Sequence, residues 1–398
     1  MTVSVIMYKR MEISNTDIAL YTSWLYLPWV IKPIWSPFVD IIKTKRFWII
    51  SMQLLIGLAL IGIALTTHLP IFFTVTLFFF WIVAFASATH DIAADGFYML
   101  GLDQHDQAWF VGVRSTFYRI AMITGSGLLI IFAGYMETST NSISMAWSIT
   151  FILLAVILIS FFLYHKFILP FPTTDSGESS IDVSVMFAEF IEVFKEFFKK
   201  DKIILIISFL LLYRFGEAQL VKLASPFLLD TKIAGGLALS TSQVGFIYGT
   251  VGLILLSIGG ILGGFLAARH GLKFWLFPMA IAMNLPNVVY VYLSYFQPGQ
   301  FWIVNTCVAI EQFGYGFGFT AYMLFMIMVS EGKHKTAHFA ITTGFMALGM
   351  MLPGMFSGWL QEHIGYQHFF IWVLIATLPG FILLPFLPID KNFGKKLS

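Results

Sequence analysis

The sequence predicts an all-α membrane protein whose helices cross the bilayer many times. Of its 398 residues, 58% are hydrophobic and only 11% are charged, and the mean hydropathy is +0.84. Apolar runs recur along the chain with the length of about 20 residues that a helix needs to span the hydrocarbon core. Soluble domains do not have this composition. The net charge of +2 comes with no basic stripe that would indicate a nucleic-acid partner.

The apolar runs predict about eleven membrane-spanning helices. A polar stretch at residues 170–201 separates the first five from the last six. The helices are expected near residues 16–36, 47–67, 70–98, 109–135, 145–169, 202–228, 241–268, 272–295, 300–329, 334–360 and 366–388. Two successive helical bundles of this kind are typical of transporters built from a repeated half.

We therefore expect an N-terminal transmembrane bundle at 1–169, a cytoplasmic linker at 170–201 and a C-terminal transmembrane bundle at 202–398. Residues 185–200 alternate apolar and charged side chains, which favours a helix on the membrane surface, although a simple tether fits equally well. The first bundle has one helix fewer than the second. Residues 1–10 look like the last turns of a missing helix, so we expect a truncated first helix of twelve. The alternative is a short tail on an eleven-helix protein.

Lysine and arginine are distributed unevenly between the two sets of loops. Most of them fall in the linker, near the C-terminus and in the loops on that same side, which predicts that the linker and the C-terminus are cytoplasmic. Charged residues also follow the second helix of each half, where a gating loop is expected. They are Asp40, Lys43 and Arg46 in the first half and Arg269 in the second.

The first half carries charged residues inside an apolar helix. His90, Asp91 and Asp95 lie deep in the run at 70–98, and Asp91 and Asp95 share one helix face because they are four residues apart. Two neighbouring carboxyls in a low dielectric do not both ionise easily, which suits a proton carrier. Tyr118 and Arg119, in the next helix, are candidate substrate contacts. The alternative is a structural role in which each acid bonds an arginine to join two helices.

The second half has its own buried charges. Arg214 and Glu217 are three residues apart, so they can pair within one helix or bind a substrate, and Gln219 follows them. Glu311 and Gln312 precede several closely spaced glycines, which suits a bendable helix lining a cavity. Ionisable residues within the membrane mark substrate or ion pathways. We therefore assign Glu217 and Glu311 to proton coupling.

The sequence gives little support for a disulfide framework, a metal site or an enzymatic activity. The single cysteine, Cys307, excludes a disulfide framework and a cysteine-based metal site. His334 and His338 have a metal-ligand spacing but no acidic partner in place, so we expect neither a metal nor another cofactor. No grouping of serine, histidine and acid indicates hydrolysis. A membrane enzyme that transfers acyl groups remains a remote alternative, because such enzymes also bury histidine and aspartate.

Several short motifs occur in a recognisable order. Residues 27–40 are rich in proline, 89–95 read Thr-His-Asp-Ile-Ala-Ala-Asp, and 212–218 read Leu-Tyr-Arg-Phe-Gly-Glu-Ala. Further matching segments lie at 118–122, 311–312 and 336–340. Together they resemble the AmpG-type muropeptide permeases, relatives of the acetyl-coenzyme A transporters within the major facilitator superfamily. His90 and Glu217 stand where the family usually has glutamine and aspartate.

The resemblance implies a major facilitator fold and proton-coupled import of an anhydro-muropeptide or a related saccharide. It places the protein in the bacterial inner membrane, and a monomer without an enzymatic activity is expected. The implied proton-coupling residues are Asp91, Asp95, Glu217 and Glu311. The implied substrate contacts are His90, Tyr118, Arg119, Arg214, Gln219 and Gln312. A carrier for another sugar, or for an acyl-coenzyme A type of metabolite, is the alternative.

Overall fold

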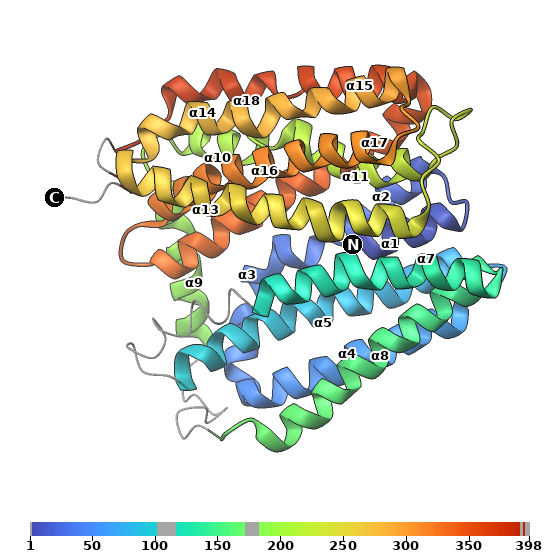
Figure 1. The fold of residues 1–398 in the computed structure, drawn as a ribbon. Helices are drawn as coiled ribbons and strands as arrows, with labels where there is room; N and C mark the ends of the chain where they lie inside the picture. Colours follow the sequence, from blue (N-terminus) through green and yellow to red (C-terminus); the bar gives the residue numbers. More distant parts are fainter. Residues whose placement is uncertain (1, 102–116, 172–182, 391–392, 395–398) are drawn as a thin grey trace. The chain divides into compact units, whose positions relative to one another are not determined.

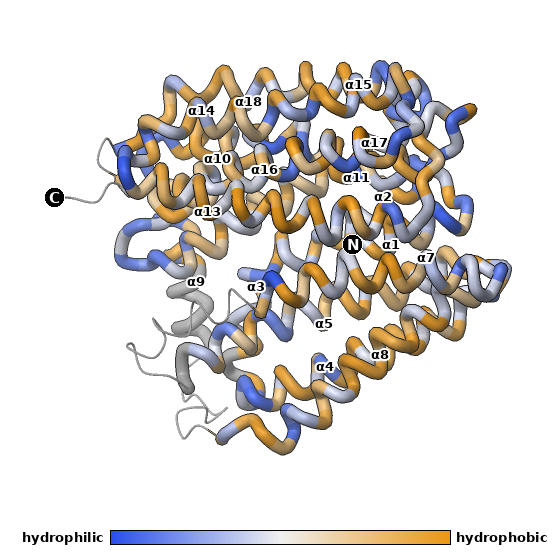
Figure 2. Tube along the Cα trace, viewed as in Figure 1, coloured by the Kyte–Doolittle hydropathy of each residue, from blue (hydrophilic) through white to orange (hydrophobic). Residues whose placement is uncertain are grey.

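The computed structural model describes residues 2–101, 117–171, 183–390 and 393–394, and within these ranges it describes only the backbone of residues 37, 40, 41, 99–101 and 183–190. All regular secondary structure in the described part of the chain is helical (Figure 1). Nine helical runs there are long and apolar enough to cross a membrane. Figure 2 shows that the long helices are mainly apolar along their length. The prediction of an all-α, multi-span membrane protein is thus confirmed.

The helices agree closely with the apolar runs of the sequence. The last of the nine runs, Lys335–Phe386, holds two expected helices, and Gly365 interrupts it with a φ of 74°, a left-handed conformation that favours glycine. The expected helix at 16–36 is divided into α2 (Asn15–Trp24) and α3 (Leu27–Ile41). The break at Gly365 thus falls between the two expected helices, whereas the break between α2 and α3 lies within an apolar run, where hydropathy alone does not detect it.

The chain forms two compact units. The first unit contains Met1–Leu27, Ile123–Ile131 and Val193–Ser398, and the second contains Pro28–Met122 and Phe132–Glu192. The predicted bundle boundaries, which follow the order of the chain, stay predictions.

The second unit is built around α4 (Lys45–Thr66), which packs against both α5 (Phe72–Gly101) and α8 (Ile143–Ile168). Thr44 begins α4 as its N-cap, because its side chain accepts a hydrogen bond from the Phe47 amide. Near the other end of α4, the Ser148 hydroxyl donates to the Ala64 carbonyl at 2.7 Å. These contacts hold α4 and α8 together.

The first unit joins the N-terminal helices to the C-terminal ones. Helix α2 packs along α17 (Lys335–Ile375), where a Cβ on Gly358 would lie 1.9 Å from the Asn15 carbonyl oxygen. Only glycine permits this approach of the two backbones, as is common between membrane helices. The other helices that lie at least partly in this unit are α1 (Thr2–Arg10), α7 (Leu129–Thr140), α9 (Val183–Phe198), α10 (Ile203–Leu212), α11 (Phe215–Leu229), α12 (Thr241–Phe246), α13 (Leu253–His270), α14 (Leu272–Asn284), α15 (Val288–Phe296), α16 (Phe301–Ser330) and α18 (Leu378–Leu383).

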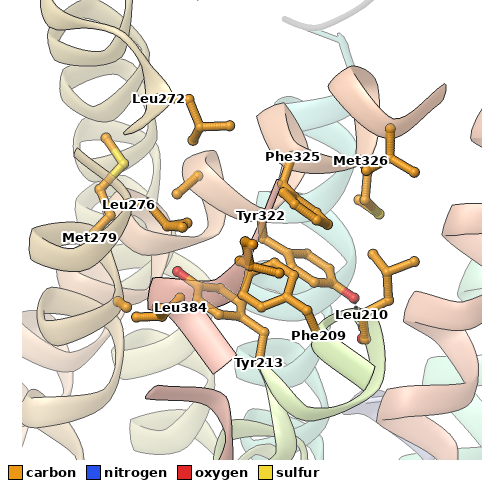
Figure 3. Packing of buried hydrophobic residues seen from close by; sticks show 14 of the residues in the cluster. Phe209, Leu210, Tyr213, Leu272, Leu276, Met279, Tyr322, Phe325, Met326 and Leu384 are labelled. Atoms are coloured by element: carbon orange, nitrogen blue, oxygen red, sulfur yellow. Dashed lines mark hydrogen bonds between the residues drawn. The ribbon is translucent and has the colours of Figure 1, made fainter. Parts of the chain in front are cut away.

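An aromatic core stabilises the first unit (Figure 3). The rings of Tyr213 and Tyr322 stack with their centroids 5.2 Å apart, and Phe209 packs beside both. The Tyr213 hydroxyl donates to the Gly318 carbonyl at 3.0 Å, and the Tyr322 hydroxyl donates to the Leu210 carbonyl. Buried tyrosines therefore satisfy their hydroxyls through backbone carbonyls. This core fixes the end of α10, directly before the residues of the candidate site.

The C-terminal end of the linker is tied to α16. The Lys200 ammonium donates to the Val329 carbonyl at 2.6 Å and to the Glu331 carbonyl at 3.2 Å. Burial lowers the pKa of Lys200, while the nearby carboxylates of Glu196 and Glu331 act in the opposite direction. These bonds fix the last residues before α10 to the end of α16 within the first unit.

Candidate functional site

A helix break positions the first group of charged residues. Helix α10 ends at Leu212, and Arg214 lies before α11 as its N-cap, with φ −107° and ψ 18°. Gly216 brings the first turn of α11 close to α17, since a Cβ there would lie 2.7 Å from the Val373 carbonyl oxygen. The break and the close approach together fix where the side chains of Arg214 and Glu217 lie.

Arg214 is buried among aromatic rings, with 6% of its surface exposed. Its Nη2 donates to the Tyr315 hydroxyl at 2.6 Å, and the guanidinium carbon lies 5.1 Å from the centroid of the Tyr315 ring and 5.0 Å from that of Phe319. Cation–π contacts of this kind stabilise a desolvated arginine. Its Nε has no hydrogen-bond partner among the described residues. The guanidinium thus retains a free donor for an anionic group.

Glu217 is fully buried, and neither of its carboxylate oxygens accepts a hydrogen bond from any described residue. The positive charge of Arg214 interacts electrostatically with Glu217. Among the described residues, however, no ion pair within 4 Å joins the two side chains. A buried carboxylate without a partner is costly. Such a group is a strong candidate for a proton-binding residue or for one that a ligand completes.

Glu311 is buried as well, but it has partners. Gln312 donates through Nε2 to both carboxylate oxygens, at 3.2 and 3.0 Å, and the Tyr290 hydroxyl lies 3.4 Å from Oε2. The Tyr290 hydroxyl is in turn hydrogen-bonded to the Tyr248 hydroxyl. Glu217 and Glu311 repel each other electrostatically. The first unit therefore holds two neighbouring buried acids in different hydrogen-bonding environments.

The two glutamines of the predicted site are occupied by the protein itself. Gln219 donates to the Phe215 carbonyl at 3.1 Å and accepts from the Trp372 indole at 2.8 Å, which joins α11 to α17. Gln312 is held by Glu311. A direct role of either glutamine in substrate binding stays a prediction.

The second unit contains a separate polar group. Asp91 of α5 forms an ion pair with Lys32 of α3, and the Asp91 side chain is 46% exposed. The His90 ring lies 3.2 Å from Gln53 Nε2, and the same amide nitrogen lies 2.8 Å from His165 Nδ1. Asp95 is half-buried on the same helix. The residue that neutralises Asp91 is thus a lysine 59 positions earlier in the chain.

The remaining predicted residues lie at the surface of their units. Tyr118 and Arg119 are exposed. Lys43 has a φ of 70° after the end of α3, and the Arg46 guanidinium lies 3.8 Å from the Phe171 ring centroid and donates through Nε to the Leu169 carbonyl at 3.1 Å. Arg269 is exposed in the last turn of α13. The side chain of Asp40 lies outside the described residues.

Sequence reasoning missed several residues of these clusters. Lys32, Tyr290 and Tyr315 were not assigned to a site, although each has a polar contact to one of the predicted acids or to Arg214. A lone lysine in the apolar run at 27–41 was the available signal for Lys32. Tyrosines are common in membrane helices, so no signal in the sequence distinguished Tyr290 and Tyr315.

Solved structures of transporters share this fold. The chain matches the crystal structure of a D-xylose-proton symporter with a TM-score of 0.71 at 14% identity, over 100% of this chain and 96% of the other. It matches the nucleoside transporter NupG with a TM-score of 0.68 at 14% identity, over 98% and 94%. The protein is therefore an all-helical, multi-pass membrane protein with the fold of major facilitator superfamily transporters.

Sequence relatives make this class more specific. The chain is 26% identical over 391 residues to a protein of Rickettsia conorii described as transporter AmpG 4, covering 95% of this chain and 90% of the relative. It is 24% identical over 385 residues to the anhydromuropeptide permease of Escherichia coli, covering 94% and 74%. No family model matches the chain. The chain is thus similar to AmpG-type transporters over nearly its whole length, and these relatives and structural neighbours are described as transporters.

Proposed function

We propose that this protein imports a peptidoglycan-derived anhydro-muropeptide, or a related saccharide, across the bacterial inner membrane in symport with protons. The similarity to the anhydromuropeptide permease extends over 94% of the chain, which supports this substrate class. The C-terminus and the linker would face the cytoplasm, in agreement with the distribution of lysine and arginine.

The observation that carries the proposal is the buried pair Glu217 and Glu311. Both lie in apolar helices of the first unit with at most 1% exposure, and Glu217 has no hydrogen-bond partner among the described residues. In a low dielectric, one of two neighbouring acids is readily protonated. Protonation removes a buried charge, so it can change the stability of one transporter conformation relative to another. That property is what proton coupling requires.

Arg214 supplies the complementary function. Its free Nε and its position near Glu217 suit it to bind a carboxylate of the carried sugar acid. We propose that protonation of Glu217 weakens its attraction for Arg214 and leaves the guanidinium available to the substrate. In the second unit, Asp91 and Asp95 would contribute to proton coupling, and His90, Tyr118 and Arg119 to substrate binding.

Uptake measurements test the proposal. Labelled N-acetylglucosaminyl-anhydro-N-acetylmuramic acid is offered to cells that lack their own permease and express this chain, with and without an uncoupler. We expect accumulation that the uncoupler abolishes. A well-expressed protein that takes up none of this solute would contradict the muropeptide assignment, and other sugars and acyl-coenzyme A compounds would then be offered in the same cells.

A further inference from the structure

Lys222 is a buried basic residue to which the transport mechanism above gives no role. It lies on α11 with 4% of its surface exposed, and its Nζ donates to the Thr22 hydroxyl of α2 at 3.0 Å. Its Nζ also lies 5.3 Å from the centroid of the Tyr26 ring. No carboxylate within 4 Å neutralises it in the part of the chain that the structure describes. An ammonium group has three donors, so most of its hydrogen-bonding capacity is unused.

The surroundings of Lys222 contain a second unused polar group. The Ser23 hydroxyl is buried and has no hydrogen-bond partner among the described residues. Gly354 lets both side chains pack closely against the backbone of α17, since a Cβ there would lie 2.8 Å from Ser23 Oγ and 3.2 Å from Lys222 Cγ. A buried lysine with one hydrogen-bond partner, and a buried hydroxyl with none among the described residues, therefore lie against the same glycine of α17.

This cluster is continuous with the Arg214 site. Tyr26, which contacts Lys222, also interacts electrostatically with Arg214 and Tyr315. The unit thus carries two buried basic residues along α11, Arg214 as its N-cap and Lys222 within it. If Lys222 only joined α2 to α11, a neutral side chain bonded to Thr22 would do so without burying a charge.

We propose that Lys222, with Ser23, forms a second contact site for the carboxylate of the transported solute, in addition to the guanidinium of Arg214. The proposal rests on the proposed function, because it assigns this subsite to an acidic saccharide. The ammonium binds the carboxylate through a charge-assisted hydrogen bond, and the Ser23 hydroxyl donates a second one. The subsite makes the transporter select acidic solutes over neutral ones of the same shape.

Binding to the purified full chain in detergent tests the subsite. Isothermal titration calorimetry compares N-acetylglucosaminyl-anhydro-N-acetylmuramic acid with its carboxamide, which has the same shape but no charge. The variants are Lys222→Met, Lys222→Arg and Ser23→Ala, and Lys273→Met, an exposed lysine at the start of α14, is the matched control. The thermal unfolding midpoint of each variant without ligand reports whether it is folded.

We expect Lys222→Met to weaken binding of the acid by roughly 30-fold or more while binding of the carboxamide changes little. Lys222→Arg should keep the preference for the acid, and Lys273→Met should match the wild type. If Lys222→Met retains the wild-type preference for the acid, the subsite is wrong while the proposed function stands.

If Lys222→Met does not fold, Ser23→Ala decides the question. A loss of acid affinity of about tenfold supports the subsite, and unchanged affinity overturns it. A wild-type protein that binds neither compound overturns the proposed function and the subsite with it.

Discussion

The Arg214 guanidinium donates a hydrogen bond of 2.6 Å to the Tyr315 hydroxyl, which connects the start of α11 to the middle of α16. The same ring lies against the guanidinium as a cation–π partner. Tyr315 therefore stabilises the buried charge of Arg214 in two ways, through the hydrogen bond to its hydroxyl and through the face of its ring. Glu217, three residues later, has no hydrogen-bond partner among the described residues. Arg214 and Glu217 should therefore respond differently to substitution.

Tyr315→Phe should destabilise the protein, because the ring remains but the acceptor for Arg214 is lost. We expect a decrease of about 1–3 kcal/mol in the free energy of unfolding, the usual result of leaving a buried donor unsatisfied. Thermal unfolding in detergent measures the change. Tyr295→Phe, at an exposed tyrosine of α15, is the control and should leave the unfolding midpoint unchanged.

Glu217→Gln should separate stability from transport. A neutral amide is less costly to bury without partners than a carboxylate, so the unfolding midpoint should stay the same or rise. Proton-coupled uptake should fall to background, because the side chain no longer changes its charge. Glu192→Gln, at an exposed glutamate of the linker, should transport normally. Wild-type uptake by Glu217→Gln would remove this residue from the coupling mechanism.

Gly358→Ala should disrupt the contact between α2 and α17. A Cβ at this position would lie 1.9 Å from the Asn15 carbonyl oxygen, so the helices must move apart. We expect a loss of stability of about 1–3 kcal/mol, as for other overpacked sites. Gly264→Ala is the matched control, because nothing lies within 4 Å of a Cβ there. Equal unfolding midpoints for the two variants would show that α2 does not pack on α17 as described.

Asp95→Asn should abolish proton-coupled uptake and leave the protein folded. The substitution keeps the shape of this half-buried side chain but removes its ability to bind and release a proton. Uptake by membrane-inserted protein of equal abundance is the measurement, and Asp201→Asn, at an exposed aspartate after the linker helix, is the control. Uptake at the wild-type rate would show that Asp95 is not a coupling residue.

Local composition was enough to predict much of the architecture. The apolar runs located the spanning helices, because each run has to be apolar along its own length to enter the bilayer. The same runs identified Asp91, Arg214, Glu217 and Glu311 as the unusual residues, since a charge within hydrocarbon stands out whatever it contacts. The break at Arg214, inside the expected helix at 202–228, could not be placed in this way, because φ and ψ depend on packing around that residue.

The sequence by itself determined the class of protein, the helices and the order of the buried charges along the chain. Only the tertiary structure decided which charges have partners: Asp91 is neutralised by Lys32, Glu311 is hydrogen-bonded by Gln312, and Glu217 is left without a partner among the described residues. The physical reason is that the partner of a buried charge can lie far from it along the chain. Hydropathy is a property of a single segment, whereas a partner for a buried charge comes from whichever helix packs beside it, and Lys222 meets Thr22 across 200 positions.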